Sequence, residues 1–275
     1  MTQVPNIRLN NGVSIPQLGF GVFQIEPART AEAVRMAFEA GYHHIDTAQG
    51  YGNEQGVGQA VRDSGLPREE VFVTTKLANG RHGYEDAIAA LDESLQRLGL
   101  DYVDLYLIHW PRPHADRYVE TWRAFEKIAS DGKARAIGVS NFQVPHLERL
   151  AAETDTVPAL NQIELHPFLV QSQLRAYHRD HGVATEAWSP LAKGGDLLRH
   201  PLLVALGEKY GKTPAQVVLR WHVQIGNVVI PKSVTPERVR QNIDVFDFEL
   251  AADDVATIET LDADVRTGPH PDHFG

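Results

Sequence analysis

The 275-residue chain contains no cysteine. This excludes disulfides, thiolate metal sites and a cysteine nucleophile, and it leaves the redox compartment undetermined. No uninterrupted apolar run approaches the ~18 residues that a membrane span needs. The first residues, MTQVPNIRLNNG, also lack the basic and apolar regions of a secretory signal. From these absences we expect a cytoplasmic protein without a membrane partner.

Basic residues are in the minority. The chain has 26 Lys and Arg against 36 Asp and Glu, which gives a formal net charge of −10. This balance argues against a general affinity for nucleic acid, although a local basic pocket for a phosphate is compatible with it. Linkers, low-complexity segments and charge runs that would divide the chain are also lacking. We therefore expect one domain over residues 1–275.

Several motifs of common enzymes are missing. There is no G-x-S-x-G elbow and no P-loop. The dinucleotide-binding pattern G-x-G-x-x-G fails at Gly19–Gly21, because Gln24 occupies its sixth position. A second G-x-G, Gly56–Gly58, lies in a helix-like stretch, where a tight turn or a helix packing contact is the plainer interpretation. His43 and His44 would face opposite sides of a strand, and no other histidines show ligand spacing, so we expect no metal site.

Strand-like and helix-like segments alternate along the chain. The strand-like runs are Gln17–Val22, His43–Asp46, Val71–Lys76, Val103–His109, Ala134–Val139, Ala159–Glu164, Val183–Trp188 and Val228–Pro231. The helix-like stretches are Thr30–Ala40, Asn53–Asp63, Tyr84–Leu98, Tyr118–Ser130, Val144–Ala152, Ser172–His181 and Thr213–Gln224. Eight such units permit a closed barrel or an open doubly wound sheet. The missing dinucleotide motif counts against a Rossmann-type sheet, but at this point the α/β protein can still be a (β/α)₈ TIM barrel or an open sheet.

Three segments fall outside the repeat. The pair Asn11-Gly12 between two short β-like runs predicts an N-terminal β-hairpin with a two-residue type I′ turn. Residues 191–206 and the segment from Leu250 predict extra helices or loops near the C-terminus. The tail TGPHPDHFG (267–275) is too irregular for a core element. It is either a mobile end or a loop folded over the barrel rim.

Four strand-like runs end in a polar residue that a core strand does not need, and these residues are Asp46, Lys76, His109 and Ser140. The intervals 46 to 76, 76 to 109 and 109 to 140 are 30, 33 and 31 residues, about one strand-plus-helix unit each. In a barrel of parallel strands all four lie on the rim where (β/α)₈ enzymes carry their chemistry. Asp46 alone could be a helix N-cap and His109 a satisfied core histidine, but a buried unpaired Lys76 is costly.

Tyr51 follows Asp46 by five residues, in a glycine-flanked loop. A phenol is a poor acid, with an ordinary pKa of about 10. We expect the ammonium of Lys76 to lower the pKa of Tyr51, and Asp46 to hold and compensate that ammonium. His109 either donates to the same substrate oxygen or tunes the tyrosine. Together these groups can deliver a proton to a carbonyl that is becoming an alcohol.

The second half of the chain offers a candidate cofactor site. Val228–Asn242 is predicted to be a strand, a proline break and a helix, with Lys232, Ser233 and Arg238 near the helix start. Barrels frequently bind phosphate at this place, although a solvated helix start is the plainer alternative. Upstream, Trp188 ends a strand and is suited to stack on a nicotinamide ring. The side chains of Ser140, Asn141 and Gln162 are suited to bind a carboxamide.

The blocks GYHHIDTAQGYGNE, TTKL, LYLIHWP, IGVSNF, NQIELHP, WSPL and IPKSVTPERVRQN occur in this order from residue 41 to residue 242. The chain therefore resembles the aldo-keto reductases, most of all the prokaryotic branch that contains the 2,5-diketo-D-gluconate reductases. The resemblance implies a (β/α)₈ barrel that binds NADPH without a Rossmann domain. It also implies reduction of aldehydes and ketones (small carbonyl or dicarbonyl compounds, or keto-sugar acids) by a monomer.

The resemblance also implies a role for each matching residue. Tyr51 would be the general acid, tuned by Lys76 and Asp46, and His109 would orient the carbonyl. The residues expected to hold NADPH, from the carboxamide to the 2′-phosphate end, are Ser140, Asn141, Gln162, Trp188, Ser189, Pro190, Leu191, Ile230, Lys232, Ser233, Val234, Arg238, Gln241 and Asn242.

Two positions depart from the family pattern. Gln241 stands where a glutamate is expected, and Ala78 stands where the family usually has a tryptophan that walls the substrate pocket. The loss of that tryptophan either widens the pocket or leaves Phe23, Trp110 and the tail to line it. Because the fold alone does not guarantee turnover, a cofactor-binding regulatory or structural protein is the alternative to an enzyme. The complete catalytic set favours the enzyme.

Overall fold

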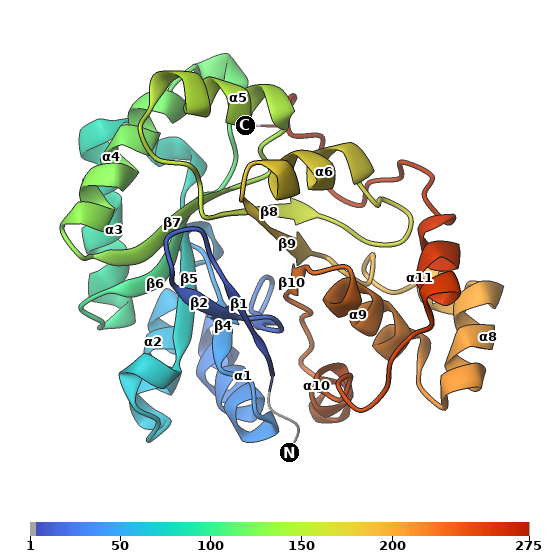
Figure 1. The fold of residues 1–275 in the computed structure, drawn as a ribbon. Coiled ribbons are helices and arrows are strands. Elements are labelled where there is room, and N and C mark those ends of the chain that lie inside the picture. The colour runs from blue at the N-terminus through green and yellow to red at the C-terminus, as the bar shows by residue number, and fades with distance from the viewer. Residues whose placement is uncertain (1–3, 275) are drawn as a thin grey trace.

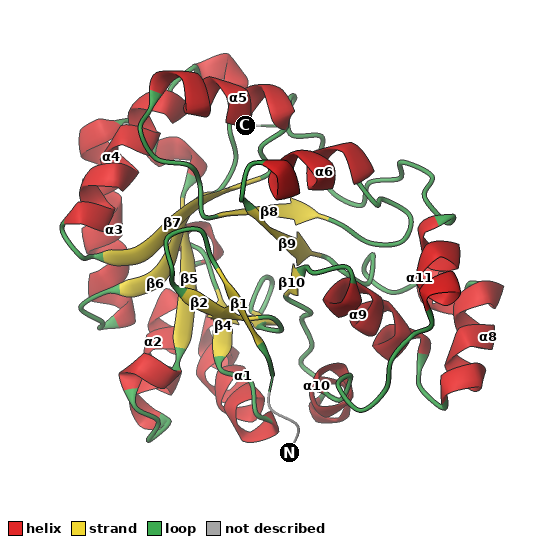
Figure 2. Cartoon of the chain, viewed as in Figure 1, coloured by secondary structure: helices red, strands yellow, loops and turns green. Residues whose placement is uncertain are grey.

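A computed structural model describes residues 4–274 of the chain, and its centre is a sheet of eight parallel strands (Figures 1 and 2). Leu18 forms a parallel bridge with Val229, and Gly19 N donates to Val229 O at 2.9 Å, so the last strand returns to the first and closes the barrel. The predicted (β/α)₈ barrel is confirmed. Its strands, in sheet order, are β3 (Phe20–Gly21), β4 (His44–Asp46), β5 (Phe72–Leu77), β6 (Val103–Ile108), β7 (Ala134–Ser140), β8 (Leu160–Glu164), β9 (Ala184–Trp188) and β10 (Val228–Val229).

Helices surround the barrel (Figure 2), and their buried apolar residues join those of the strands in one core. In α3, for example, Leu91, Leu95 and Leu98 are buried at three- and four-residue spacing, and Gly99 ends the helix at φ 64°. The seven predicted helices are confirmed to within three residues at their N-termini and one at their C-termini. They are α1 (Pro27–Ala40), α2 (Glu54–Asp63), α3 (Tyr84–Leu98), α4 (Tyr118–Ser130), α5 (Val144–Glu153), α6 (Ser172–Asp180) and α9 (Pro214–Gln224).

The C-terminal part adds helices, as the sequence predicted. Short α7 (Asp196–Arg199) and α8 (Pro201–Tyr210) precede α9, while α10 (Pro236–Ile243) and α11 (Ala252–Glu259) follow β10. Helix α10 completes the eighth strand–helix unit and packs beside α1, which closes the outer ring of helices. The other three are additions on the side of the barrel that carries the last two strands (Figure 1).

An N-terminal hairpin, β1 (Asn6–Arg8) and β2 (Ser14–Pro16), covers the amino-terminal end of the barrel. Its apolar residues Leu9 and Ile15 pack against barrel residues such as Phe72 and Leu105. Asn11 Nδ2 also donates to Arg135 O at 3.0 Å. Since the hairpin covers this end, the carboxyl ends of the strands form the opposite, functional rim.

The hairpin is confirmed, but its predicted two-residue type I′ turn is wrong. Leu9 N donates to Val13 O at 2.8 Å, so three residues form the loop. Of these three only Gly12 has a positive φ, 87°, whereas a type I′ turn needs two residues there. The pair Asn11-Gly12 is equally compatible with a three-residue hairpin loop in which only the glycine has a left-handed backbone conformation.

Gly58 lets α2 and α3 approach closely. A Cβ built at Gly58 would lie 1.7 Å from Leu98 O, and one at Gly56 would lie 2.8 Å from Thr30 Cβ. The second G-x-G is therefore a helix packing contact, the plainer of the two interpretations that the sequence left. No nucleotide loop is needed to explain it.

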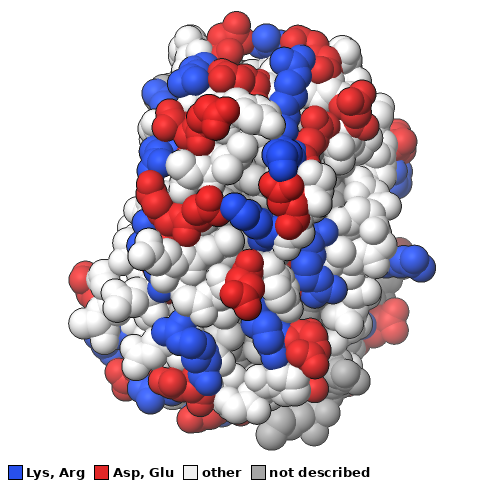
Figure 3. All heavy atoms as spheres, turned by 90° about the vertical axis from the view of Figure 1, so that its left-hand side faces the viewer, with Lys and Arg blue, Asp and Glu red and all other residues white. Residues whose placement is uncertain are grey.

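The surface on the side of α3, α4 and α5 carries interspersed charges. Figure 3 shows Lys and Arg side chains alternating with Asp and Glu over this face, without an extended region of one sign. This face therefore offers no extended basic surface. Separately, none of the helices within residues 4–274 combines the length and the apolar character needed to cross a bilayer.

We predict that Gly58→Ala lowers the free energy of unfolding by about 3 kcal/mol, because the added methyl overlaps a backbone carbonyl that cannot move alone. Urea denaturation measures this. Gly80→Ala is the matched control: no atom lies within 4 Å of a Cβ built there, so its effect should stay within about 0.5 kcal/mol. Equal midpoints for the two variants would refute the packing role of Gly58.

Candidate active site

Three of the predicted catalytic residues meet around one ammonium group. Lys76 in β5 is completely buried, and its Nζ donates to Asp46 Oδ1 at 2.6 Å and to Thr47 O at 2.9 Å. The hydroxyl of Tyr51 lies 3.5 Å from the same Nζ. Asp46 is the last residue of β4, and Tyr51 ends the 3₁₀ helix Gln49–Tyr51. The strand-end pattern therefore correctly predicted this convergence.

Two side chains that the sequence analysis missed hold the loop of Tyr51 in place. Asn53 Nδ2 donates to Val22 O at 2.9 Å, and Asn53 Oδ1 accepts from Thr47 Oγ1 at 2.8 Å. Gln49 Oε1 accepts from the backbone N of Ala78 at 3.1 Å. These bonds tie the loop after β4 to both neighbouring strand ends, so the phenol is positioned before any ligand binds.

The ionisation of Tyr51 differs from the sequence-based expectation. Burial raises the pKa of the Tyr51 phenol, and the opposing effect of the Lys76 charge is smaller, so the pKa lies above its usual value. The expectation of a lowered pKa was wrong because it ignored the loss of hydration around a phenolate. Tyr51 consequently keeps its proton at neutral pH.

Lys76 remains charged despite its burial. Burial lowers the pKa of Lys76, but Asp46 and Tyr51 together raise it above its usual value. The structure thus provides a fixed cation within reach of the phenol oxygen. Such a cation stabilises a phenolate that forms when Tyr51 gives up its proton.

His109 follows β6 and faces Tyr51, with ring centroids 5.7 Å apart in an edge-on arrangement. Burial and the nearby Lys76 charge lower the pKa of His109 to about 3. The imidazole is therefore neutral at neutral pH and can donate one N–H bond. Asn141 Nδ2 donates to His109 O at 3.0 Å and so fixes the backbone at this position.

The residues expected to hold a carboxamide lie beside the catalytic set. Ser140 Oγ donates to Gln162 O at 2.8 Å, and Asn141 Oδ1 accepts from Trp188 Nε1 at 2.8 Å. Gln162 Nε2 donates to Asp46 Oδ2 at 2.8 Å, which links the two groups directly. The amide NH₂ of Gln162 is thus used within the protein, and its Oε1 is left for another partner.

The proposed phosphate-binding residues lie between the end of β10 and the first turns of α10. Lys232 and Arg238 are exposed, and within residues 4–274 neither forms an ion pair with a carboxylate. Ser233 Oγ accepts from Thr235 N at 3.1 Å. The other predicted cofactor residues lie after β9 and on the same β10–α10 segment, and they are Ser189, Pro190, Leu191, Ile230, Val234, Gln241 and Asn242.

The C-terminal tail is folded over the rim, which decides between the two alternatives that the sequence left. Buried Glu164, at the end of β8, accepts from Thr267 N and Thr267 Oγ1, both at 2.6 Å, and from Gly268 N at 3.2 Å. Further along, the ring of Phe274 lies 4.5 Å from that of Trp110. Gly275 of the predicted tail lies outside the described residues.

The predicted substrate-pocket residues Phe23, Ala78 and Trp110 lie on the loops after β3, β5 and β6. Phe23 is 53% exposed, and its ring lies 5.0 Å from that of Tyr51. Trp110 is held between Trp188 and Phe274, with ring centroids 6.4 Å and 4.5 Å away. Ala78 leaves this side of the rim without a large side chain. Phe274 is the tail residue beside Trp110, and the sequence analysis gave Phe23, Trp110 and the tail as one possible lining of the pocket.

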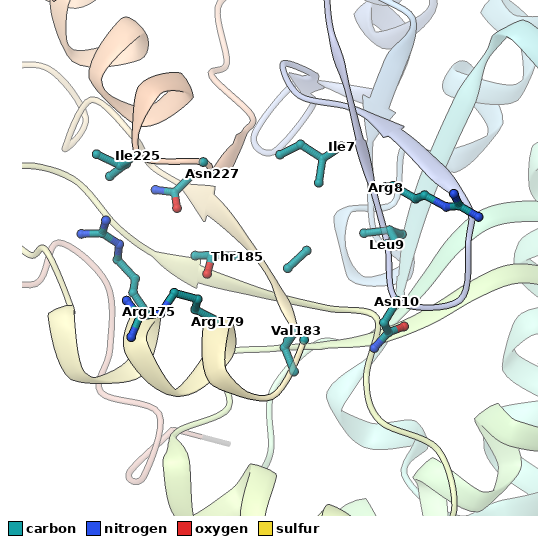
Figure 4. Close-up of a pocket in the computed structure, with 13 residues that line it drawn as sticks. Ile7, Arg8, Leu9, Asn10, Arg175, Arg179, Val183, Thr185, Ile225 and Asn227 are labelled. Atoms are coloured by element: carbon teal, nitrogen blue, oxygen red, sulfur yellow. The ribbon is translucent and has the colours of Figure 1, made fainter.

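A cavity of about 400 Å³ lies at the other end of the barrel, between β1, α6 and the turn before β10 (Figure 4). Arg175, Arg179 and Asn227 contribute to its lining, but none of the predicted site residues does. Arg175 is already paired with Glu259 at 2.9 Å. The cavity is therefore separate from the rim described above.

The sequence analysis also missed Glu186, a buried carboxyl group near Asp46. Glu186 in β9 accepts from Gln162 Nε2 at 2.9 Å, and its other oxygen lies 3.8 Å from His44 Nε2. Burial, followed by the charge of Asp46, raises the pKa of Glu186 to about 8. The sequence contained a signal for this residue, because side chains two positions apart on a strand face the same side. Glu186 precedes Trp188, at the rim, by two positions.

The histidines and carboxylates of the described residues do not come together in threes as metal ligands would. Throughout the described chain, no group of three His, Asp or Glu side chains is arranged to hold an ion. His43 and His44 face opposite sides of β4, as predicted: His43 Nδ1 lies 3.0 Å from Glu70 O outside the barrel, whereas His44 is buried inside it beside Thr74.

Comparison with known proteins agrees with this site. The model of the aldo/keto reductase family matches residues 17–263. The chain belongs to this family. An aldo-keto reductase of Mycolicibacterium smegmatis is 54% identical over 270 residues, with 98% of each chain covered. The methylglyoxal reductase DkgA of Yersinia pestis is 50% identical over 277 residues, with 100% of this chain and 99% of the relative covered.

Solved structures show the same fold. A crystal structure of a Gox0644 mutant in complex with NADPH superimposes with a TM-score of 0.95 at 45% identity, and the match covers 100% of both chains. Family membership confirms the resemblance that the ordered sequence blocks indicated. The chain is therefore an aldo-keto reductase by family, and its closed barrel follows the fold of these relatives.

We predict that Glu164→Gln loosens the tail, because the uncharged amide replaces charge-assisted hydrogen bonds to Thr267 and Gly268 with weaker ones. Hydrogen exchange of these two amides should become about tenfold faster. Glu93→Gln, which alters an exposed carboxylate paired with Arg81 at 2.9 Å, is the control and should leave the tail amides unchanged. Unchanged exchange in Glu164→Gln would contradict the anchoring role.

Proposed function

We propose that the protein is an NADPH-dependent carbonyl reductase that converts small aldehydes, ketones and dicarbonyl compounds to alcohols. The observation that carries this proposal is the ammonium of Lys76, held by Asp46 at 2.6 Å and lying 3.5 Å from the Tyr51 hydroxyl. A protein that only binds a ligand has little use for a buried cation beside a phenol. The arrangement is suited to transfer of a proton.

The polar groups of the rim fit NADPH. Lys232 and Arg238, which form no ion pair within residues 4–274, offer positive charge for a 2′-phosphate, and Ser233 adds a hydroxyl. Gln162 Oε1 and the Ser140–Asn141 pair offer hydrogen-bonding groups for a carboxamide, and the half-buried ring of Trp188 provides a stacking surface. When bound there, NADPH supplies the hydride for the carbonyl carbon.

The side chains of the protein donate the proton and stabilise the group that has lost it. Tyr51 donates its hydroxyl proton to the carbonyl oxygen, and Lys76 stabilises the phenolate that remains. Asp46 keeps Lys76 in place and charged. The neutral imidazole of His109 donates an N–H bond to the same carbonyl oxygen and orients it. Because the groups are preorganised away from bulk water, each interaction acts at a low effective dielectric constant.

The aromatic groups around Tyr51 favour a small substrate. Phe23, Trp110 and Phe274 provide an apolar wall, and Ala78, on the loop after β5, contributes no large side chain to it. The likeness to a methylglyoxal reductase supports the dicarbonyl class, and the likeness of the rim blocks to diketo-gluconate reductases makes keto-sugar acids a second class to test. We further propose that residues 1–275 act as one domain, as a monomer in the cytoplasm. Size-exclusion chromatography with light scattering tests the monomer.

We predict that Tyr51→Phe lowers kcat by at least about a thousandfold, because the phenylalanine keeps the ring contacts and lacks the transferable proton. NADPH oxidation with methylglyoxal measures kcat, and fluorescence titration should show NADPH binding unchanged. Tyr84→Phe, at the start of α3, is the control and should retain parental activity. If Tyr51→Phe turns over at a near parental rate, Tyr51 is not the acid. If the parent protein binds NADPH but consumes none with any carbonyl tested, the alternative holds, and the chain is a cofactor-binding regulatory or structural protein.

We predict that Arg238→Ala weakens NADPH binding about tenfold to a hundredfold and NADH binding by less than about twofold, because only NADPH carries the 2′-phosphate. Arg240→Ala, an exposed arginine of the same helix α10, is the control and should change neither affinity. Isothermal titration of both cofactors with both variants measures this. Equal losses for NADPH and NADH in Arg238→Ala would show that Arg238 does not contact the 2′-phosphate.

A further inference from the structure

A second buried carboxyl group lies next to the catalytic set. Glu186 is completely buried in β9, and its Oε2 accepts from Gln162 Nε2 at 2.9 Å. The same NH₂ group donates to Asp46 Oδ2 at 2.8 Å. One amide therefore joins two carboxyl groups, and the other oxygen of Asp46 holds Lys76.

Glu186 has no cation of its own. Its Oε1 lacks a hydrogen-bond partner within the described residues, and the nearest basic atom, His44 Nε2, lies 3.8 Å away. Burial, together with the Lys76 charge, lowers the pKa of His44 to about 3, so this imidazole is neutral. The ring of His44 fits here because position 19 is glycine: a Cβ there would lie 2.5 Å from His44 Nδ1.

The polar groups around Glu186 come from three strands. His44 and Asp46 face it from β4, Lys76 acts on it from β5, and Gln162 donates to it from β8. Strand β10, which pairs with β9, presents only the apolar residues Val228 and Val229. Within residues 4–274, Lys76 is the one cation that pairs with either of these two carboxyl groups. When both are ionised, the buried cluster has an excess of negative charge.

This excess charge acts on the proposed acid. Burial and the charge of Asp46 raise the pKa of Glu186, so the carboxyl keeps its proton at neutral pH. Once ionised in alkaline solution, Glu186 raises the pKa of Lys76 and of Tyr51. The ionised carboxylate therefore keeps the proton on Tyr51 to a higher pH than the neutral carboxyl would.

We propose that Glu186 is a positioning residue of the reductase, which fixes the amide of Gln162 beneath Asp46 and, when ionised, opposes formation of the Tyr51 phenolate. This inference rests on the proposed function. The placement of Gln162 leaves Oε1 of its amide for a cofactor carboxamide, so Glu186 acts on two functional groups through one hydrogen bond. It touches neither the substrate nor the transferred proton.

Glu186→Gln tests the proposal, because the amide keeps the shape and an acceptor for Gln162 while removing the charge. The kcat/KM for NADPH-dependent reduction of methylglyoxal is measured from about pH 6 to about pH 10. At neutral pH the variant should stay within about threefold of the parent. Its alkaline fall in kcat/KM should move to lower pH by roughly half a unit or more, because a buried charge no longer retains the phenolic proton.

Thr185→Val is the matched control. Thr185 lies next to Glu186 in β9 but faces outward, where its Oγ1 is 2.9 Å from His178 Nδ1. The valine variant loses a buried hydrogen bond on the same strand, so it should unfold at a lower temperature and keep the parental pH profile. An unshifted profile in Glu186→Gln, or an equal shift in Thr185→Val, overturns the proposal.

A measurement on the parent protein covers the case in which Glu186→Gln does not fold. In a parent protein labelled with ¹³C at glutamate Cδ, one carboxyl resonance should titrate in alkaline solution. The ordinary pKa of glutamate, about 4.3, lies far below that range. Titration of every glutamate in the ordinary range overturns the proposal. If the parent consumes no NADPH, the proposed reductase function fails on its own, and the resonance still decides whether Glu186 holds its proton.

Discussion

The ammonium of Lys76 lies inside the barrel without access to water, and the rest of the rim is arranged around it. A charge in this position is tolerated only with a close partner, and Asp46 supplies one at 2.6 Å. Breaking such a buried pair typically destabilises a protein by about 3–5 kcal/mol. Because Asp46 and Lys76 come from neighbouring strands, the ion pair also ties the loop of Tyr51 to β5. One electrostatic requirement thus serves both stability and the proposed chemistry.

The closed barrel determines which side chains can join this cluster. Alternate residues of a strand face the interior, so His44 and Asp46 of β4 and Glu186 of β9 project toward the same space. The hairpin covers the amino-terminal end, and the tail covers part of the carboxyl-terminal rim (Figure 1). Polar groups between these two covers have little contact with water. This explains why burial outweighs the charge of Lys76 in setting the pKa of Tyr51.

Family membership and local structure answer different questions about this protein. The match to the aldo/keto reductases gives the fold and the reaction class. The proposed substrate side has features of this chain: Ala78 after β5, and a tail that brings the ring of Phe274 to 4.5 Å from that of Trp110. The anchor of that tail is Glu164. Its burial raises its pKa, but its hydrogen bonds to His166, Thr267 and Gly268 together outweigh the burial and lower the pKa below its usual value. The position of the tail over the rim therefore rests in part on contacts between the end of β8 and residues 267 and 268.

The sequence by itself determined the alternation of strands and helices, the residues at the strand ends and the family. Each is a local property: the apolar period of α3, the αL cap at Gly99, and Lys76 directly behind an apolar run. Only the tertiary structure decided the three-residue hairpin loop, the position of the tail over the rim, the raised pKa of Tyr51 and the hydrogen bond between Gln162 and Glu186. Gln162 and Asp46 are 116 residues apart in the chain, yet they share a hydrogen bond. Such pairs, and the loss of hydration that accompanies them, arise only when the barrel closes, and no local pattern encodes their energy.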